Sequence, residues 1–176
     1  MRGRGFHSPA KHKQVAVSDG TTKNDLIFGS QARDTISGHE GNDFLAGKKA
    51  RDDLFGNDDN DTLIGGRGGD RLNGGVGDDN LVGGKGADVF ILNGGFDTIA
   101  DFSNRDDTLA IDTRAYFADK PEGMISFLLY DAETGLLSLR RDRYDEGSEV
   151  IEIGQTAPEL HFGGIQHGGN YLLFLA

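Results

Sequence analysis

Apolar residues return at one fixed phase along the middle of this chain, at every ninth position, a period that fits neither a helix nor a simple alternating strand. An aspartate stands two places before each apolar residue, and a glycine stands five places before nearly every aspartate. The apolar column is Ile27, Ile36, Leu45, Leu54, Leu63, Leu72, Leu81, Phe90 and Ile99. The aspartate column is Asp25, Asp34, Asp43, Asp52, Asp61, Asp70, Asp79, Asp88 and Asp97, and the glycine column is Gly20, Gly29, Gly38, Gly47, Gly56, Gly65, Gly74 and Gly83. Such self-similarity indicates a repeat architecture rather than a flexible Gly/Asp-rich linker, which needs no apolar residue at a fixed phase.

The sequence pattern predicts that each nine-residue unit forms a six-residue turn, which ends at the aspartate, followed by a short strand. We number the turns by unit, from turn 1 (20–25) to turn 9 (92–97). Side chains alternate along a strand, so the apolar residue points inward and its two neighbours point outward. Two units complete one coil, and unit n lies above unit n+2, about 4.8 Å away. The pattern therefore predicts a parallel solenoid whose core receives one side chain from each unit.

Composition makes a second stabilising agent necessary. Only 36% of the chain is hydrophobic and 28 of its 176 residues are glycine, so the core is thin. The net charge is -11, which disfavours nucleic acid as a partner and favours cations. The chain has no cysteine, which excludes disulfides and thiolate metal sites, and no apolar run of membrane-spanning length. The basic segment 1–19 has no signal-peptide core and is expected to be a disordered tail.

Stacking would bring the aspartates of units n and n+2 together along one edge. Two carboxylates about 5 Å apart repel by about 3 kcal/mol at an effective dielectric constant of about 20. A divalent cation between the turns reverses the sign of this interaction. Carboxylates and backbone carbonyls offer the all-oxygen ligands that Ca²⁺ prefers, whereas Mg²⁺ gives up its water reluctantly. We therefore expect several Ca²⁺ ions to bind, and their binding energy to be folding energy.

The candidate metal-binding residues are the column aspartates together with the glycines that shape the better-preserved turns. They are Asp25, Asp43, Gly56, Asp61, Gly65, Gly66, Gly68, Asp70, Gly74, Gly75, Gly77, Asp79, Gly83, Gly84, Gly86, Asp88 and Asp97. Strong sites are expected between turns 6 and 8 and between turns 5 and 7, and further sites between turns 3 and 5 and between turns 7 and 9. Turns 2 and 4 carry Ala32 and Ala50 where glycine is expected, and Arg33 and Arg51 beside the aspartate. The site between Asp34 and Asp52 is therefore expected to be weak or empty, with arginine as a substitute for the ion.

The two predicted sheets differ in their outward residues. The odd units present an apolar face: Leu26, Phe28, Phe44, Ala46, Ile64 and Val82. The even units present a mostly polar face: Thr35, Ser37, Asp53, Arg71 and Asn73, with Phe55, Val89 and Ile91 as exceptions. Either the C-terminal segment or a partner, such as a polysaccharide or a protein, covers the apolar face, or these side chains simply lie on the surface.

Residues 101–176 leave the register and are expected to form a mainly-β cap. Strands are expected near Leu109 and Ile111 and at 124–130, 136–140, 149–153 and 171–175, and 114–119 is compatible with a helix. A solenoid needs such a cap to seal its exposed end.

The unit resembles the nonapeptide G-G-x-G-x-D-x-U-x of the repeats-in-toxin (RTX, hemolysin-type) calcium-binding family, and the resemblance covers 20–100. The stretches 97–112 and 127–153 and the apolar end YLLFLA resemble the C-terminal region of type I secretion substrates. The resemblance implies an all-β protein with a right-handed parallel β-roll at 20–100 and a C-terminal cap and secretion region at 101–176. It also implies recognition by the type I secretion machinery, and folding on Ca²⁺ outside the cell.

Catalytic signatures are missing. His39-Glu40 begins a zinc-protease motif, but Asp43 stands where its second histidine is needed, and no lipase G-x-S-x-G or P-loop occurs. We therefore expect a secreted structural or interaction protein and no enzyme. Two alternatives remain open: the C-terminal module of a larger secreted protease, lipase or epimerase, and a polysaccharide-binding module.

Overall fold

The computed structural model describes residues 16–103, 105–112, 127–131, 134–140, 150–156, 165–167 and 170–174. Within these ranges every regular element is a strand, and none is a helix that could cross a membrane. The region compatible with a helix, 114–119, lies outside the described residues.

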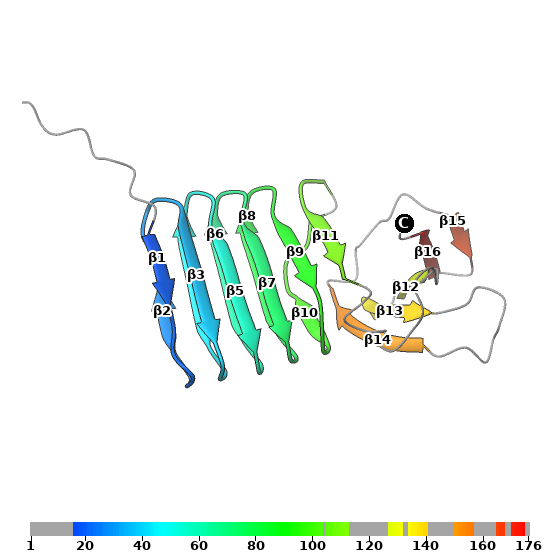
Figure 1. The fold of residues 1–176 in the computed structure, drawn as a ribbon. Coiled ribbons are helices and arrows are strands. Elements are labelled where there is room, and N and C mark those ends of the chain that lie inside the picture. The colour runs from blue at the N-terminus through cyan, green and yellow to red at the C-terminus, as the bar shows by residue number, and fades with distance from the viewer. Residues whose placement is uncertain are drawn as a thin grey trace, which may run out of the picture.

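Two parallel sheets face each other along a solenoid (Figure 1). The first sheet has the order β1-β3-β5-β7-β9-β11 and contains the even units. Its strands are β1 (Ala16–Asp19), β3 (Asp34–His39), β5 (Asp53–Asp58), β7 (Arg71–Val76), β9 (Val89–Leu92) and β11 (Thr108–Ile111). The odd units form β2 (Leu26–Phe28), β4 (Phe44–Lys49), β6 (Thr62–Arg67), β8 (Asn80–Lys85) and β10 (Asp97–Ile99), which lie in the second sheet.

The register confirms the predicted coil of two units. Ile36 pairs with Leu54, and Leu54 with Leu72, so each strand lies beside the strand 18 residues later. The apolar column is buried as expected from its second member onward: Ile36, Leu45, Leu54, Leu63, Leu72, Leu81, Phe90 and Ile99 are at most 1% exposed. Ile27, in the first coil, is only partly buried. The core is thus one side chain wide, and its stability depends on what holds the two edges.

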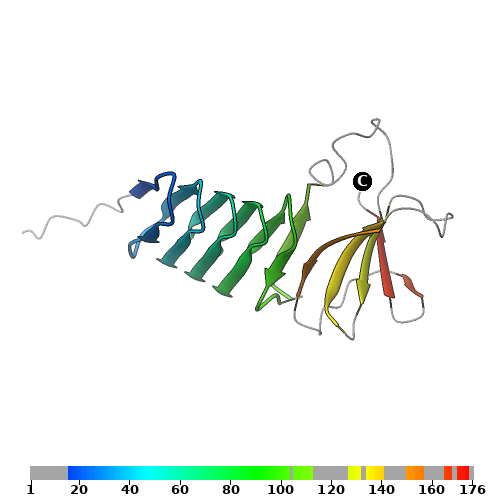
Figure 2. The ribbon, with the colours of Figure 1, turned by 90° about the horizontal axis from the view of Figure 1, so that it is seen from below.

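The second sheet does not stop at the end of the roll. β10 pairs in parallel with β8 on one side and with β14 (Val150–Gln155) on the other. The sheet continues through the antiparallel strands β13 (Leu136–Arg140), β12 (Phe127–Asp131), β16 (Asn170–Phe174) and β15 (Ile165–His167), which fan out beyond the roll in Figure 2. The mainly-β cap is therefore confirmed, and Leu137 contributes to the same core as the repeat.

The roll extends beyond its expected boundaries, 20 and 100, at both ends. Residues 16–19, assigned to a disordered tail, form β1 and pair with β3, because their backbone completes a coil although they carry no column residues. At the other end β11 pairs with β9, so the parallel ladder continues past residue 100.

The apolar outer face of the odd-unit sheet stays open at its first strands. Leu26 is 66% exposed and Phe28 is 53% exposed. The C-terminal strands extend the edge of this sheet through β14. At the first strands, this agrees with the interpretation that short outward side chains lie on the surface.

Candidate metal centre

The column aspartates are buried although they carry charge. From Asp34 to Asp97 each is at most 3% exposed. From Asp43 to Asp97, one carboxylate oxygen of each has a defined role, because Oδ1 accepts a hydrogen bond from the backbone N–H of the aspartate 18 residues earlier. This bond is 2.8 Å long from Asp43 N to Asp61 Oδ1, and the same bond recurs from Asp25 through Asp79.

The second carboxylate oxygen has no such partner. Six Oδ2 atoms are buried and accept no hydrogen bond from the protein: those of Asp43, Asp52, Asp61, Asp70, Asp79 and Asp97. A buried, unpaired carboxylate oxygen is costly. Burial accordingly raises the pKa of Asp61 to about 7 and the pKa values of Asp52 and Asp70 to about 6. Burial also raises the pKa of both Asp79 and Asp97, which interact with each other.

Backbone conformation aims carbonyl oxygens at the neighbouring turn. In turns 3 to 8 the second and fourth residues all have positive φ: His39, Gly41, Lys48, Ala50, Asn57, Asp59, Gly66, Gly68, Gly75, Gly77, Gly84 and Gly86. A Cβ at Gly68 would collide with the carbonyl oxygen of Ala50, which shows that this carbonyl faces the next turn on the same edge. Asn57 and Asp59 face Gly75 and Gly77 in the same way.

The leading glycine of each unit is required for a different reason. A Cβ at Gly56 would collide with Oδ2 of Asp61 and with the carbonyl oxygen of Gly74. Gly65, Gly74 and Gly83 lie against the Oδ2 of their own aspartates as well. Gly56, Gly65 and Gly74 therefore leave room for an oxygen that has no hydrogen-bond partner.

Turns 1 and 2 are built differently. Neither has a residue with positive φ at its second or fourth position. Instead, Thr21 N–H donates to Asp25 Oδ2 and Ser30 N–H donates to Asp34 Oδ2, so the oxygen left open in later turns is satisfied here by the backbone. Arg33 does not replace an ion, because its guanidinium pairs with Asp53 Oδ2 at 2.7 Å.

The donor set fits a hard divalent cation. Unpaired anionic oxygens and carbonyl oxygens lie in the same turns, and Ca²⁺ takes six to eight oxygen ligands. Within the described residues no group of three or more acidic or histidine side chains lies close enough to hold a metal. A bound ion would therefore take most of its ligands from backbone carbonyls and the rest from column aspartates.

We call turns 3 to 8, whose second and fourth residues have positive φ, open turns, and turns 1 and 2, whose Oδ2 accepts from the backbone, closed turns. The residues predicted from the sequence to bind metal fall in both kinds of turn. In turns 5 to 8, Asp61, Asp70, Asp79 and Asp88 and their glycines come together in stacked turns of the open kind, and Asp43 and Asp97 are buried in the same column. Asp25 instead lies in a turn that is already closed. Metal binding by each of these residues stays a prediction.

Three aspartates outside the predicted metal-binding set also belong to the column or accept hydrogen bonds from its turns. Asp52 was set aside because of Ala50 and Arg51, yet its turn has the open conformation and its Oδ2 is unpaired. Asp107 continues the column after one inserted residue: its Oδ1 accepts from Asp88 N–H and its Oδ2 from Ser103 N–H. Asp101 accepts from the N–H groups of both Gly83 and Gly84. The sequence signal for the continued column is Asp106, which stands in phase nine residues after Asp97, with Asp107 one place later.

The odd edge has an additional ladder that the even edge lacks. The Asn24 side-chain oxygen accepts from Asn42 N–H, that of Asn42 from Asn60 N–H, and that of Asn60 from Asp78 N–H. The corresponding residues of the even turns are Arg33, Arg51, Gly69 and Ala87, which have no such acceptor.

A parallel β-roll with stacked, buried aspartates and open turns defines the class of cation-dependent solenoids. A family model described as an RTX calcium-binding nonapeptide repeat matches in four overlapping copies, over residues 19–54, 38–72, 47–81 and 64–99. Residues 19–99 are thus RTX calcium-binding nonapeptide repeats that form a β-roll.

Two further comparisons add little. No curated protein matches the chain. Among solved structures, the AlgE6R3 subunit of the Azotobacter vinelandii mannuronan C5-epimerase is similar at 22% identity, over 77% of this chain and 72% of that one, with a TM-score of 0.37.

Proposed function

We propose that this protein is secreted and that its roll folds when Ca²⁺ binds outside the cell, where it serves a structural or interaction role and catalyses no reaction. The observation that carries the proposal is the set of six buried Oδ2 atoms without a hydrogen-bond partner. Their cost opposes folding at neutral pH when no cation is present, and a bound Ca²⁺ removes it.

RTX proteins are typically secreted. The calcium concentration outside the cell supports the same location for this roll. Extracellular calcium modules work at about 10⁻⁴ to 10⁻³ M Ca²⁺. A site with few carboxylates per ion, as here, matches that weak range. Export by the type I machinery is part of the proposal and follows from the resemblance of the C-terminal segment.

A second candidate, a module of a larger secreted protein, is favoured by the first coil. β1 and β2 are the outermost strands of their sheets, and within the described residues nothing pairs with their outer edges. A preceding module could add a coil there, whereas β14 already occupies the other end of the second sheet.

The test is a calcium titration followed by far-ultraviolet circular dichroism, with magnesium as the control. The expected result is a disordered spectrum in chelator that becomes β-rich with Ca²⁺ and stays disordered with Mg²⁺. A β-rich spectrum in chelator that calcium leaves unchanged would refute the proposal.

A further inference from the structure

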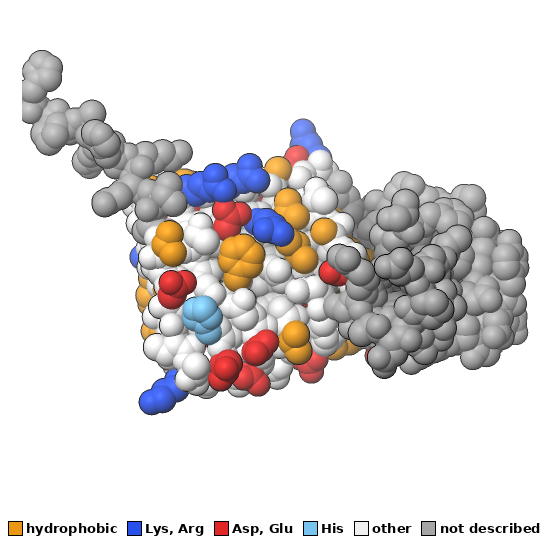
Figure 3. Space-filling view, in the orientation of Figure 1, with side chains coloured by type: hydrophobic (Ala, Val, Ile, Leu, Met, Phe, Trp, Pro, Cys, Tyr) orange, Lys and Arg blue, Asp and Glu red, His pale blue; other side chains and the backbone are white. Residues whose placement is uncertain are grey.

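The two edges of the roll carry opposite charge once the column aspartates are set aside. The even turns add six Lys and Arg residues and no further acid: Arg33, Lys48, Lys49, Arg51, Arg67 and Lys85. The odd turns add Glu40, Asp58, Asp59 and Asp78 against a single basic residue, Lys23. Figure 3 shows the consequence: Lys and Arg side chains gather along the edge above β3 and β5, and acidic side chains gather along the opposite edge.

Most of these charges have no ionic partner in the part of the chain that the structure describes. Among the residues that the structure describes, the ion pairs involve only Arg33, His39 and Arg105 with aspartates. Lys48 lies over the Phe28 ring, 5.3 Å from its centroid. The remaining exposed cations, Lys49, Arg51, Arg67 and Lys85, form what we term the basic edge.

Both edges repeat their charges at the spacing of the coils. Lys49 pairs with Arg67 across neighbouring strands, and Arg67 pairs with Lys85. On the other edge His39 pairs with Asn57, so the residues that follow them, Glu40 and Asp58, stand one coil apart. The exposed acids Glu40, Asp58, Asp59 and Asp78 form the acidic edge.

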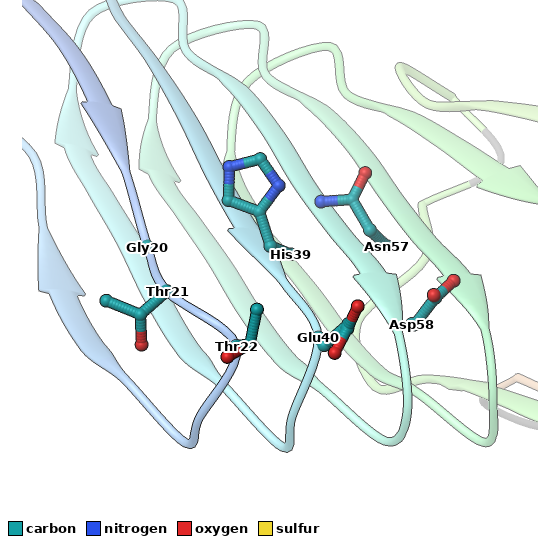
Figure 4. A pocket seen from close by; sticks show the side chains of 7 residues that line it. All are labelled: Gly20, Thr21, Thr22, His39, Glu40, Asn57 and Asp58. Atoms are coloured by element: carbon teal, nitrogen blue, oxygen red, sulfur yellow. The ribbon is translucent and has the colours of Figure 1, made fainter.

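The acidic edge is also hollowed. A shallow pocket of about 450 Å³ is lined by Gly20, Thr21, Thr22, His39, Glu40, Asn57 and Asp58. Its hydroxyl, amide and carboxylate groups come from three successive odd turns, as Figure 4 shows. These are groups that accept hydrogen bonds from a lysine or arginine side chain.

We propose that the basic edge of one molecule docks against the acidic edge of a second copy, so that calcium-folded rolls associate side by side. The inference rests on the proposed function, since the edges exist only in the folded roll and bound Ca²⁺ compensates the column aspartates. Charges at equal spacing face each other in register. An anionic polymer would meet the basic edge but leave the acidic edge and its pocket unmatched.

The symmetry of this contact follows from where the edges lie. Because the two edges lie on opposite sides of the roll, the contact is heterologous: a two-fold pair would bring like charges together. A heterologous contact that does not close generates an open ribbon. Exposed ion pairs are individually weak and are screened by salt, so the association is weak and depends on ionic strength.

The test is sedimentation velocity of the full chain at saturating Ca²⁺ over a range of concentrations. We expect the mean size to grow with concentration at about 20 mM salt and the association constant to fall by about tenfold or more at about 500 mM salt. Two charge-reversal variants isolate the edges: Lys49→Glu/Arg67→Glu/Lys85→Glu and Glu40→Lys/Asp58→Lys. Each alone is expected to stay monomeric, and an equimolar mixture is expected to associate again, because each variant then presents what the other lacks.

Several results would overturn the inference. One is a wild-type chain that stays monomeric at every concentration. This outcome counts against the inference even if the chain binds an anionic polymer such as heparin. Another is association that persists in the basic-edge variant, which would indicate calcium bridging between acidic surfaces. Circular dichroism of each sample separates the two proposals: a chain that calcium does not fold contradicts the proposed function, whereas a folded chain that stays monomeric contradicts only the side-by-side contact.

Discussion

Turns 2 and 4 lie next to each other on the same edge and have nearly the same sequence, yet they fold differently. Both read Gly-x-x-Ala-Arg-Asp. In turn 4, Lys48 and Ala50 have φ values of 84° and 73°, and Asp52 Oδ2 is left unpaired. In turn 2 neither corresponding residue has positive φ, and Asp34 Oδ2 is satisfied by Ser30 N–H.

The residue at the second position of the turn explains the difference. The Ser30 hydroxyl donates to Asp34 Oδ1 and accepts from Ala32 N–H, and these local bonds compete with the open conformation. Thr21 closes turn 1 in the same way, and Ser103 N–H bonds to Asp107 at the far end of the column. Turns 3 to 8 have His, Lys, Asn or Gly at this position and are open. A column aspartate alone is thus insufficient for an open turn. A serine or threonine four residues before the aspartate closes the turn.

The largest expected effect comes from removing one open carboxylate. Asp61→Asn keeps an oxygen for the bond from Asp43 N–H but removes the charge that a cation needs. We expect the calcium midpoint of folding to rise by about tenfold or more, because ligand charge sets affinity in such sites. Asp34→Asn is the matched control, since its carboxylate already accepts from Ser30, and should change the midpoint by less than about threefold. Equal shifts in the two calcium titrations would remove the distinction between open and closed turns.

The next effect is the pH dependence of the calcium-free roll. Burial raises the pKa of Asp61 to about 7 and those of Asp52 and Asp70 to about 6, above the ordinary value of about 3.9. A raised carboxyl pKa means that the folded state holds its proton when the unfolded chain has lost it. Stability is therefore lost as pH rises from about 4 to about 7.

In chelator, the chain should accordingly show more β-structure at pH 5 than at pH 8, where it is expected to be disordered, as measured by circular dichroism. Saturating calcium should flatten or reverse this trend, because protons then compete with the ion. A β-sheet content in chelator that rises with pH would contradict the burial of these carboxylates.

The smallest effect is expected from substitutions at the second position of turns 2 and 4, the position that distinguishes the two turns. Ser30→Gly should open turn 2 and add one bound ion, whereas Lys48→Ser should close turn 4 and remove one. The change in folding free energy at fixed calcium should be about 1 kcal/mol, comparable to the cost of one non-glycine residue in left-handed geometry. Ion counts by mass spectrometry or calorimetry check this, and unchanged counts in both variants would show that the second position does not control the turn.

Period and phase were enough to predict the coil of two units, the buried apolar column and the stacked aspartates, because each depends on spacing alone. The conformation of individual turns was less accessible. Asp52 was discounted because of its neighbours Ala50 and Arg51. The open turns stacked next to turn 4 on the same edge nevertheless hold Ala50 at positive φ, a conformation that alanine seldom adopts. Asp107 was missed because one inserted residue shifted its phase. The joining of β14 to β10 could not be foreseen, since it pairs segments more than 50 residues apart with no shared pattern.

The aspartate ladder gives the roll a direction. From Asp25 to Asp88, each column aspartate donates its backbone N–H toward the C-terminus, to an aspartate carboxylate of the next coil. From Asp43 to Asp97, each also offers its own carboxylate toward the N-terminus. An unmatched acceptor at the first coil can be met by water, while an unmatched buried donor at the last coil is costly. The last coils are therefore the ones that need protein acceptors, and Asp101 and Asp107 supply them. Growth of the roll from its C-terminal end, coil by coil, leaves no column-aspartate N–H unmatched, whereas growth from the N-terminal end leaves the N–H of each new column aspartate unmatched until the next coil forms.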